Sequence, residues 1–307
     1  MNTPSNAVPE SSFPQGLAPE PVSATRLMYW SIQRELWENR SIYIAPLVAA
    51  AVFLFGFLIN MVALRRGSHG AWPLDPAKLH DVLTARYELS AALIMGTALI
   101  VGMFYSLDAL YGERRDRSIL FWKSLPVSDV TTVLSKLAIP FVILPLLSLA
   151  ITLATQFLML VLSSAMLAGS GVNIAMLWTQ ASFLQVSLLI LYHLFTVHGL
   201  WYAPLYGWLL LVSAWAPRAP FLWALLPPFV ICGVEKIAFN TSHALSMLQY
   251  RLMGPGGAMA PEHAPKDFMA TLIPHHFFST PGLWTGLAVA AVFLFAAVRL
   301  RRYQGPI

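Results

Sequence analysis

Long apolar stretches alternate with short polar ones along most of this chain. Five of the apolar stretches are long enough to span a bilayer: residues 42–64, 87–110, 137–163, 221–239 and 282–298. A membrane-spanning helix needs about 20 mainly apolar residues. The stretches are apolar throughout and lack the two-residue alternation that is typical of barrel strands. The pattern therefore predicts an all-α integral membrane protein.

A further apolar block, residues 174–216, is too long for one straight span. Gly199 and Pro204 flank residues 200–203, and a proline inside a helix removes a backbone hydrogen bond and bends or breaks the helix. The block is therefore either one broken span or two separate spans.

Charge distribution favours one crossing for this block. With six spans in total, both termini share one side, and that side holds twelve of the nineteen basic residues. Two crossings would place either the C-terminal or the N-terminal arginines on the opposite side. Because basic residues accumulate on the cytoplasmic side of membrane proteins, we expect six spans and cytoplasmic termini. The twelve are Arg26, Arg34, Arg40, Arg114, Arg115, Arg117, Lys123, Lys136, Arg218, Arg299, Arg301 and Arg302.

The N-terminal region divides into two parts. Residues 1–22 are rich in Pro and Ser and contain no Lys, Arg or apolar core, so they predict a disordered cytoplasmic tail and not a signal peptide. Residues 23–41 carry Met28, Ile32 and Leu36 at helical spacing, together with tryptophans and charges. This segment predicts an amphipathic helix at the membrane surface, or alternatively a polar extension of the first span. Residues 42–307 then form the transmembrane domain, with an external loop at 240–281.

Composition supports the membrane assignment and excludes several other classes. The chain is 57% hydrophobic and 11% charged, whereas a soluble domain has about 25% charged residues. The single cysteine, Cys232, lies among apolar residues and excludes a disulfide framework or a multi-cysteine metal site. No basic stretch is interleaved with aromatic residues, so nucleic acid is not an expected partner.

The most charged stretch, residues 111–136, predicts a cytoplasmic hairpin between two spans. Charges of both signs occupy residues 113–117, and an apolar segment follows at 119–122. Pro126 ends the first helix, and Ser128 or Asp129 can cap the next one. A short elbow joined to two membrane helices is suited to receiving motion from a soluble partner. The alternative is an ordinary basic loop that only fixes topology.

This hairpin resembles the cytoplasmic loop of ABC-2 type transporter permeases, the membrane subunits of bacterial ABC exporters. The shared features fall on Glu113, Arg114, Arg117-Ser118-Ile119, Leu125-Pro126-Val127-Ser128 and Lys136. The sequence departs from the common pattern at Ser118, Phe121, Trp122 and Lys123, which leaves the substrate subtype open.

The resemblance implies a multi-pass protein of the bacterial inner membrane that pairs with a second permease subunit, identical or different, and with separate ABC ATPase subunits. The chain has no G-x-x-x-x-G-K-[ST] phosphate loop, so we expect ATP and Mg²⁺ to bind the ATPase. No cofactor, metal or catalytic residue is expected in this chain. The residues expected to contact the ATPase are Glu113, Arg114, Arg117, Phe121, Trp122 and Pro126.

Other polar and aromatic residues offer weaker candidates. Glu235 and Lys236, at the far end of the span 221–239, and the aromatic pair Trp201 and Tyr202 are candidates for a gate or a path for an amphipathic substrate. Their alternative roles are structural. Two other functions stay open: a non-transporting scaffold, and an intramembrane enzyme that uses Glu235 or the histidines His193 and His198. The histidines are five residues apart, a spacing that does not place them on one face of an α-helix, so we expect packed neutral side chains.

Overall fold

The computed structural model describes residues 23–66, 76–124, 127–167, 175, 178, 183–257 and 277–307. Over these residues the chain is almost entirely helical and contains no strand, which confirms the predicted all-α class. The predicted tail 1–22, Pro126 and a large part of the external loop lie outside the described residues.

Five helical segments are long and apolar enough to cross a membrane. They are α2 (Ser41–Arg66), α3 (Pro76–Asp108), the continuous run of α6 (Asp129–Ala138), η1 (Ile139–Ile143) and α7 (Leu144–Leu167), then α11 (Pro220–Phe239) and α14 (Pro281–Tyr303). All five predicted stretches are therefore found as helices.

The long block divides into α9 (Phe183–His193), η2 (Leu194–Trp201) and α10 (Ala203–Trp215). The helix axis bends by 47° at Tyr202, within the predicted break. Counted as one broken span, this pair brings the number of spans to six. The architecture is consistent with a multi-pass membrane protein.

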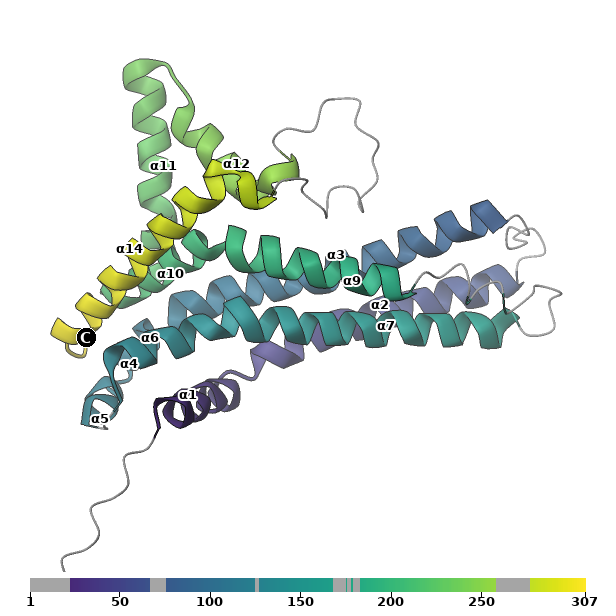
Figure 1. Cartoon of the computed structure of the whole chain (residues 1–307), viewed down its shortest axis with the longest axis horizontal. Helices are drawn as coiled ribbons and strands as arrows, with labels where there is room; N and C mark the ends of the chain where they lie inside the picture. Colours follow the sequence, from purple (N-terminus) through teal and green to yellow (C-terminus); the bar gives the residue numbers. More distant parts are fainter. Residues whose placement is uncertain are drawn as a thin grey trace, which may run out of the picture.

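The first spans pack along one another, whereas the later ones diverge from them. In Figure 1, α2, α3, α7 and α9 run side by side along the long axis, and α11 stands away from them. Most apolar side chains of α11 are exposed, so this helix needs lipid or another protein to cover it. After α11, α12 (His243–Gly257) folds back toward α14 (Figure 1). Part of the segment 240–281, predicted to be an external loop, is therefore helical.

The termini of the described chain lie at the same end of the molecule as the charged hairpin. Helices α1 (Ala24–Glu38), α4 (Tyr111–Arg115) and α5 (Ile119–Ser124) gather there with the end of α14 (Figure 1). This is the arrangement that an even number of crossings produces.

Helix α1 is amphipathic in its packing. Ile32 and Leu36 pack against a buried cluster that includes Ile42 and Tyr105, whereas Trp30 and Trp37 are exposed. The exposed tryptophans suit a membrane interface, and a location at the membrane surface stays a prediction.

Candidate functional site

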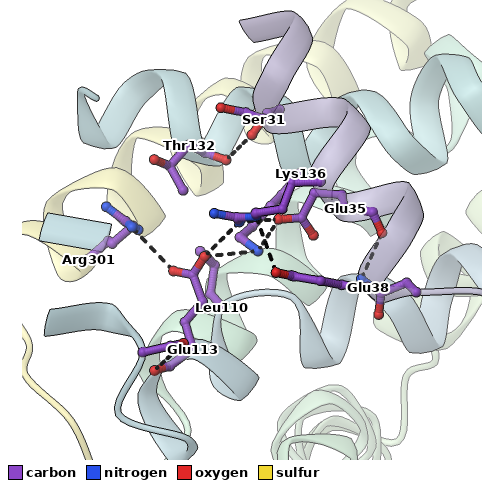
Figure 2. A network of polar contacts seen from close by, with 12 residues as sticks. Ser31, Glu35, Glu38, Leu110, Glu113, Thr132, Lys136 and Arg301 are labelled. Carbon is purple, nitrogen blue, oxygen red and sulfur yellow. Dashed lines mark hydrogen bonds and ion pairs between the residues drawn. The ribbon is translucent and has the colours of Figure 1, made fainter. Parts of the chain in front are cut away.

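A buried cluster of ion pairs lies where α1, α4, α6 and α14 meet. Figure 2 shows Glu35, Glu113, Lys136 and Arg301 pointing toward one another from these four helices. Each of the four side chains is at most 7% exposed. Charged residues are almost never fully buried unless they are paired, and each of these four side chains has a partner of opposite charge. We call these four residues, together with Arg34, Tyr105 and Asp129, the charge cluster.

Lys136 and Arg301 hold Glu113 from two directions. The Nζ atom of Lys136 lies 3.2 Å from Oε1 of Glu113, and Nη2 of Arg301 lies 3.2 Å from Oε2 of Glu113. Arg301 also pairs with Asp129. The Glu113 carboxylate on α4 thus contacts both the span that begins with α6 and the last span, α14.

Glu35 connects α1 to the same cluster. Its Oε1 atom lies 2.8 Å from Nζ of Lys136, and its Oε2 atom accepts a hydrogen bond of 2.8 Å from the hydroxyl of Tyr105. Arg34 reaches both Glu35 and Glu113. Burial opposes ionisation of Glu35, but Lys136, Arg34 and Tyr105 outweigh that penalty and lower the pKa of its carboxyl group. Glu35 is therefore an anion at neutral pH.

The cluster contains equal numbers of acidic and basic side chains, and Arg34 also pairs at 3.6 Å with Glu38, an exposed residue outside the cluster. Three carboxylates, from Glu35, Glu113 and Asp129, face three cations, from Arg34, Lys136 and Arg301. A buried ion pair gains little over an apolar contact, but removing one partner leaves an uncompensated buried charge and costs about 3–5 kcal/mol. These ion pairs therefore connect the four helices at this end of the molecule.

Arg114 fixes the hairpin to a fifth element, the end of α10. Its Nη1 atom donates hydrogen bonds to the carbonyl oxygens of Ala214 at 2.6 Å and Ala216 at 3.2 Å. The Ser213 hydroxyl accepts from the backbone N–H groups of Leu110 and Tyr111, at 2.9 Å each. A cation placed on the last carbonyls of a helix is favourable, so the start of α4 is held against α10.

The outer face of the hairpin is apolar and exposed. On α5, Leu120 is 60% and Phe121 is 59% exposed. The Phe121 ring packs edge-on against Trp122, and the guanidinium of Arg34 lies 3.8 Å from the centre of the Trp122 ring. Arg117, which is exposed and has φ of 58°, turns the chain from α4 into α5. Ser128 caps α6 by accepting from the Thr131 N–H at 3.0 Å, as predicted.

The predicted ATPase contacts thus fall into two groups. Glu113 and Arg114 are buried among residues of this chain, whereas Arg117 and Phe121 are exposed and Trp122 is half-buried. The structure also brings in residues that the sequence analysis did not single out for the site: Glu35, Tyr105 and Arg301. One signal for Glu35 was present, because it lies between Ile32 and Leu36 on the apolar side of α1.

The C-terminal segment lies along the hairpin. The Lys123 ammonium group donates to the carbonyl oxygens of Arg302 at 3.3 Å and Gln304 at 2.8 Å. The backbone N–H of Ile307 donates to the Arg114 carbonyl at 3.2 Å. These contacts join the end of the chain to both helices of the hairpin.

Glu235 lies outside the charge cluster and caps a helix. Its carboxylate accepts hydrogen bonds of 2.7 Å from the Thr241 hydroxyl and from the backbone N–H groups of His243 and Ala244. These N–H groups begin α12, where a carboxylate is the favoured partner. Lys236 is exposed. The geometry supports the structural interpretation of Glu235.

Trp201 and Tyr202 form one wall of an apolar cavity between α10, α11, α12 and α14. The cavity has a volume of about 430 Å³. Both aromatic side chains bind the backbone of α12: the Trp201 indole donates to the Arg251 carbonyl at 3.0 Å, and the Tyr202 hydroxyl donates to the Leu252 carbonyl at 2.9 Å.

The expectation that His193 and His198 do not share a helix face is wrong. Their ring centres lie 5.6 Å apart, because the chain adopts a π-helix from Leu194 to Trp201. Bonding from i to i+5 brings residues five apart onto one face. Within the described residues, no group of three or more His, Cys, Asp or Glu side chains is placed to hold a metal ion.

Comparisons of the chain with protein-family models, with curated proteins and with solved structures found no match.

Proposed function

We propose that this chain is the membrane-spanning permease subunit of a bacterial ABC exporter, driven by a separate ATPase. The observation that carries the proposal is the contrast between the two faces of the hairpin. Its outer face presents Leu120 and Phe121 to the surroundings, and its inner face is held by buried ion pairs to several long helices. An exposed docking element with rigid internal connections suits the transmission of force.

The exposed face supplies the docking surface. Large aromatic side chains and arginines dominate the energetics of protein interfaces, and Phe121 with Trp122 and Arg34 combines both kinds. An ATPase groove that accepts Phe121 removes an apolar side chain from water. Arg117, exposed at the turn before α5, would lie at the polar rim of that contact.

The buried face transmits the movement. A displacement of α4 acts through Glu113 on Lys136 of α6, and α6 continues into η1 and α7. The same displacement acts through Glu113 on Arg301 of α14. Because packed interfaces shift between discrete arrangements and do not deform continuously, binding and release of the ATPase would switch these spans together.

The assembly we propose contains two permease subunits, the same or different, and two ATPase subunits that bind ATP and Mg²⁺. Its location is the bacterial inner membrane, with the hairpin and both termini in the cytoplasm. The exported substrate is amphipathic, since the described spans place few ionisable groups away from their ends.

The test is copurification of the chain with a candidate ABC ATPase from the same organism. Phe121→Asp places a charge in the docking surface and abolishes copurification while membrane insertion stays normal. Phe278→Asp is the matched control, because Phe278 is a similarly exposed phenylalanine, at 56%, that precedes α14 at its other end. Equal recovery of the ATPase with both variants and with the unaltered chain would contradict the proposal.

A further inference from the structure

Among the described residues that line the apolar cavity beside Trp201, Arg251 is the only cation. The cavity volume of about 430 Å³ is within the range of about 300–1,000 Å³ that is usual for small-molecule sites. One lining residue, Ile231, is 60% exposed, so the cavity reaches the outer surface of the protein. Most of its wall is aliphatic or aromatic, including Leu205, Trp208, Ile231, Leu248, Val289 and Phe293, and Arg251 is also part of the wall.

Arg251 is held in place by uncharged groups. Its guanidinium lies 4.5 Å from the centre of the Trp201 ring, and it donates to the carbonyl oxygens of Trp201 and Gly282. No carboxylate of the described residues forms a salt bridge with it. Burial lowers the pKa of Arg251, which is the effect expected of a partly desolvated cation.

Two glycines of α14 leave the space that the side chains of Arg251 and Tyr250 occupy. Gly282 and Gly286 lie one turn apart on α14, and a Cβ atom on Gly286 would come within 2.0 Å of Nη2 of Arg251. A Cβ atom on Gly282 would lie 3.0 Å from the Tyr250 hydroxyl. The glycines therefore let α12 bring its arginine against α14, at the wall of the cavity.

We infer that this cavity binds an anionic phospholipid, with an acyl chain along the apolar wall and the phosphate at Arg251. The apolar wall favours a hydrocarbon chain. An arginine presents five N–H donors in a planar fork and makes bidentate contacts with phosphate. A lipid with a net negative head group supplies both the hydrocarbon chain and the unpaired phosphate. In a zwitterionic lipid, the cationic group of the head group already pairs with the phosphate, so Arg251 is expected to bind it less well. This site goes beyond the proposed function, because binding needs neither an ATPase nor transport.

The chain contains its own reporter for the cavity. Cys232 is the only cysteine in the sequence, it is partly exposed, and it lines the cavity. A bound acyl chain covers the thiol and slows its alkylation by N-ethylmaleimide. The rate can be followed on the purified full chain without introducing another cysteine.

The experiment titrates phosphatidylglycerol or phosphatidylcholine into the detergent-purified chain and measures the alkylation rate of Cys232. Phosphatidylglycerol is expected to slow alkylation in a saturable manner, and phosphatidylcholine is expected to have little effect. Arg251→Gln weakens the affinity for phosphatidylglycerol at least about tenfold, which corresponds to about 1.4 kcal/mol. Arg251→Lys, which keeps the charge, retains part of the affinity. Lys236→Gln is the matched control, because Lys236 is an exposed cation of α11 that does not line the cavity.

A second variant keeps the test decisive if Arg251→Gln disturbs folding. Val289→Trp fills the cavity from α14 and leaves Arg251 in place, so it also removes the protection by phosphatidylglycerol. Equal protection by both lipids, or full protection in the Arg251→Gln and Val289→Trp variants, would overturn the inference.

Discussion

Glu113 on α4 and Lys136 on α6 face each other at 3.2 Å in a position where both side chains are at most 7% exposed. This pair joins the hairpin to the span that contains α7, and it places a residue of the docking element inside the helix bundle. A surface ion pair contributes little to stability or to coupling. A buried one makes the position of α4 depend directly on that of α6.

Removing one partner of this pair is expected to destabilise the protein strongly. Lys136→Met removes one of the two cations that Glu35 and Glu113 share, the other being Arg34, and we expect a loss of about 3–5 kcal/mol. A double-mutant cycle with Glu113→Gln tests the interaction itself. The double variant is expected to lose less stability than the sum of the two single variants, by about 0.5–3 kcal/mol, as measured by thermal or denaturant unfolding of the purified chain. Strict additivity would show that the pair is not coupled.

Stability should fall at low pH in a manner that depends on Glu35. The pKa of Glu35 is lowered from its ordinary value of 4.5, so its ionised form binds more favourably in the folded state. This contribution is complete above the ordinary pKa and is lost as the pH falls through the lower value of the folded protein. The wild-type chain is expected to have a higher unfolding midpoint than Glu35→Gln at neutral pH. This difference is expected to shrink below about pH 4.5. A difference that stays constant across that range would contradict the assignment.

Two adjacent arginines should behave differently when they are truncated. Arg114 donates to two carbonyl oxygens at the end of α10, and a hydrogen bond to a charged group contributes about 1.5–3 kcal/mol. Arg115 is exposed and pairs with the exposed Asp108 and Asp116, so its removal should change stability by no more than about 0.5 kcal/mol. Unfolding of Arg114→Ala and Arg115→Ala under identical conditions makes the comparison. Equal losses of stability in the two variants would show that the hydrogen bonds of Arg114 to α10 do not stabilise the fold.

Topology reporters test the proposed number of spans. Reporters placed at Arg117, Arg218 and Gln304 should give cytoplasmic signals, and one at Gly257 should give a periplasmic signal, because six spans return the chain to its starting side. A periplasmic signal at Gln304 would mean that the bent pair α9–η2 and α10 crosses the membrane twice.

The helices were predictable from the sequence for a simple physical reason. A lipid bilayer offers no hydrogen bonds to the backbone, so a long apolar stretch has few structures available to it besides a helix. The cap at Ser128 and the break near Tyr202 followed from local chemistry in the same way. These features depend on residues that are close together in the chain.

The charge cluster depends on residues that are far apart, and most of it was not predicted. Glu35 and Lys136 are 101 residues apart, and no local pattern indicates that they pair. The family resemblance made Glu113 an expected ATPase contact, which stays a prediction, and gave no sign that its carboxylate lies against Arg301 inside the fold. The histidine pair was misjudged because the expected spacing was that of an α-helix, and η2 is a π-helix.

The central claim, that the charge cluster transmits motion from an ATPase to the far end of the spans, is tested most directly by one distance measurement. Spin labels are attached at Ile59→Cys on α2 and Phe278→Cys before α14 in a Cys232→Ala chain. Ile59 and Phe278 are both exposed and lie toward the ends of α2 and α14 that are opposite the hairpin. Labelled chains are diluted with unlabelled ones, and the distance is recorded with the ATPase bound, with and without ATP. We predict a shift of this distance on ATP binding that is lost in Glu113→Gln but kept in the control Asp116→Asn, while both variants still bind the ATPase through Phe121. The same ATP-dependent shift in Glu113→Gln would contradict the claim.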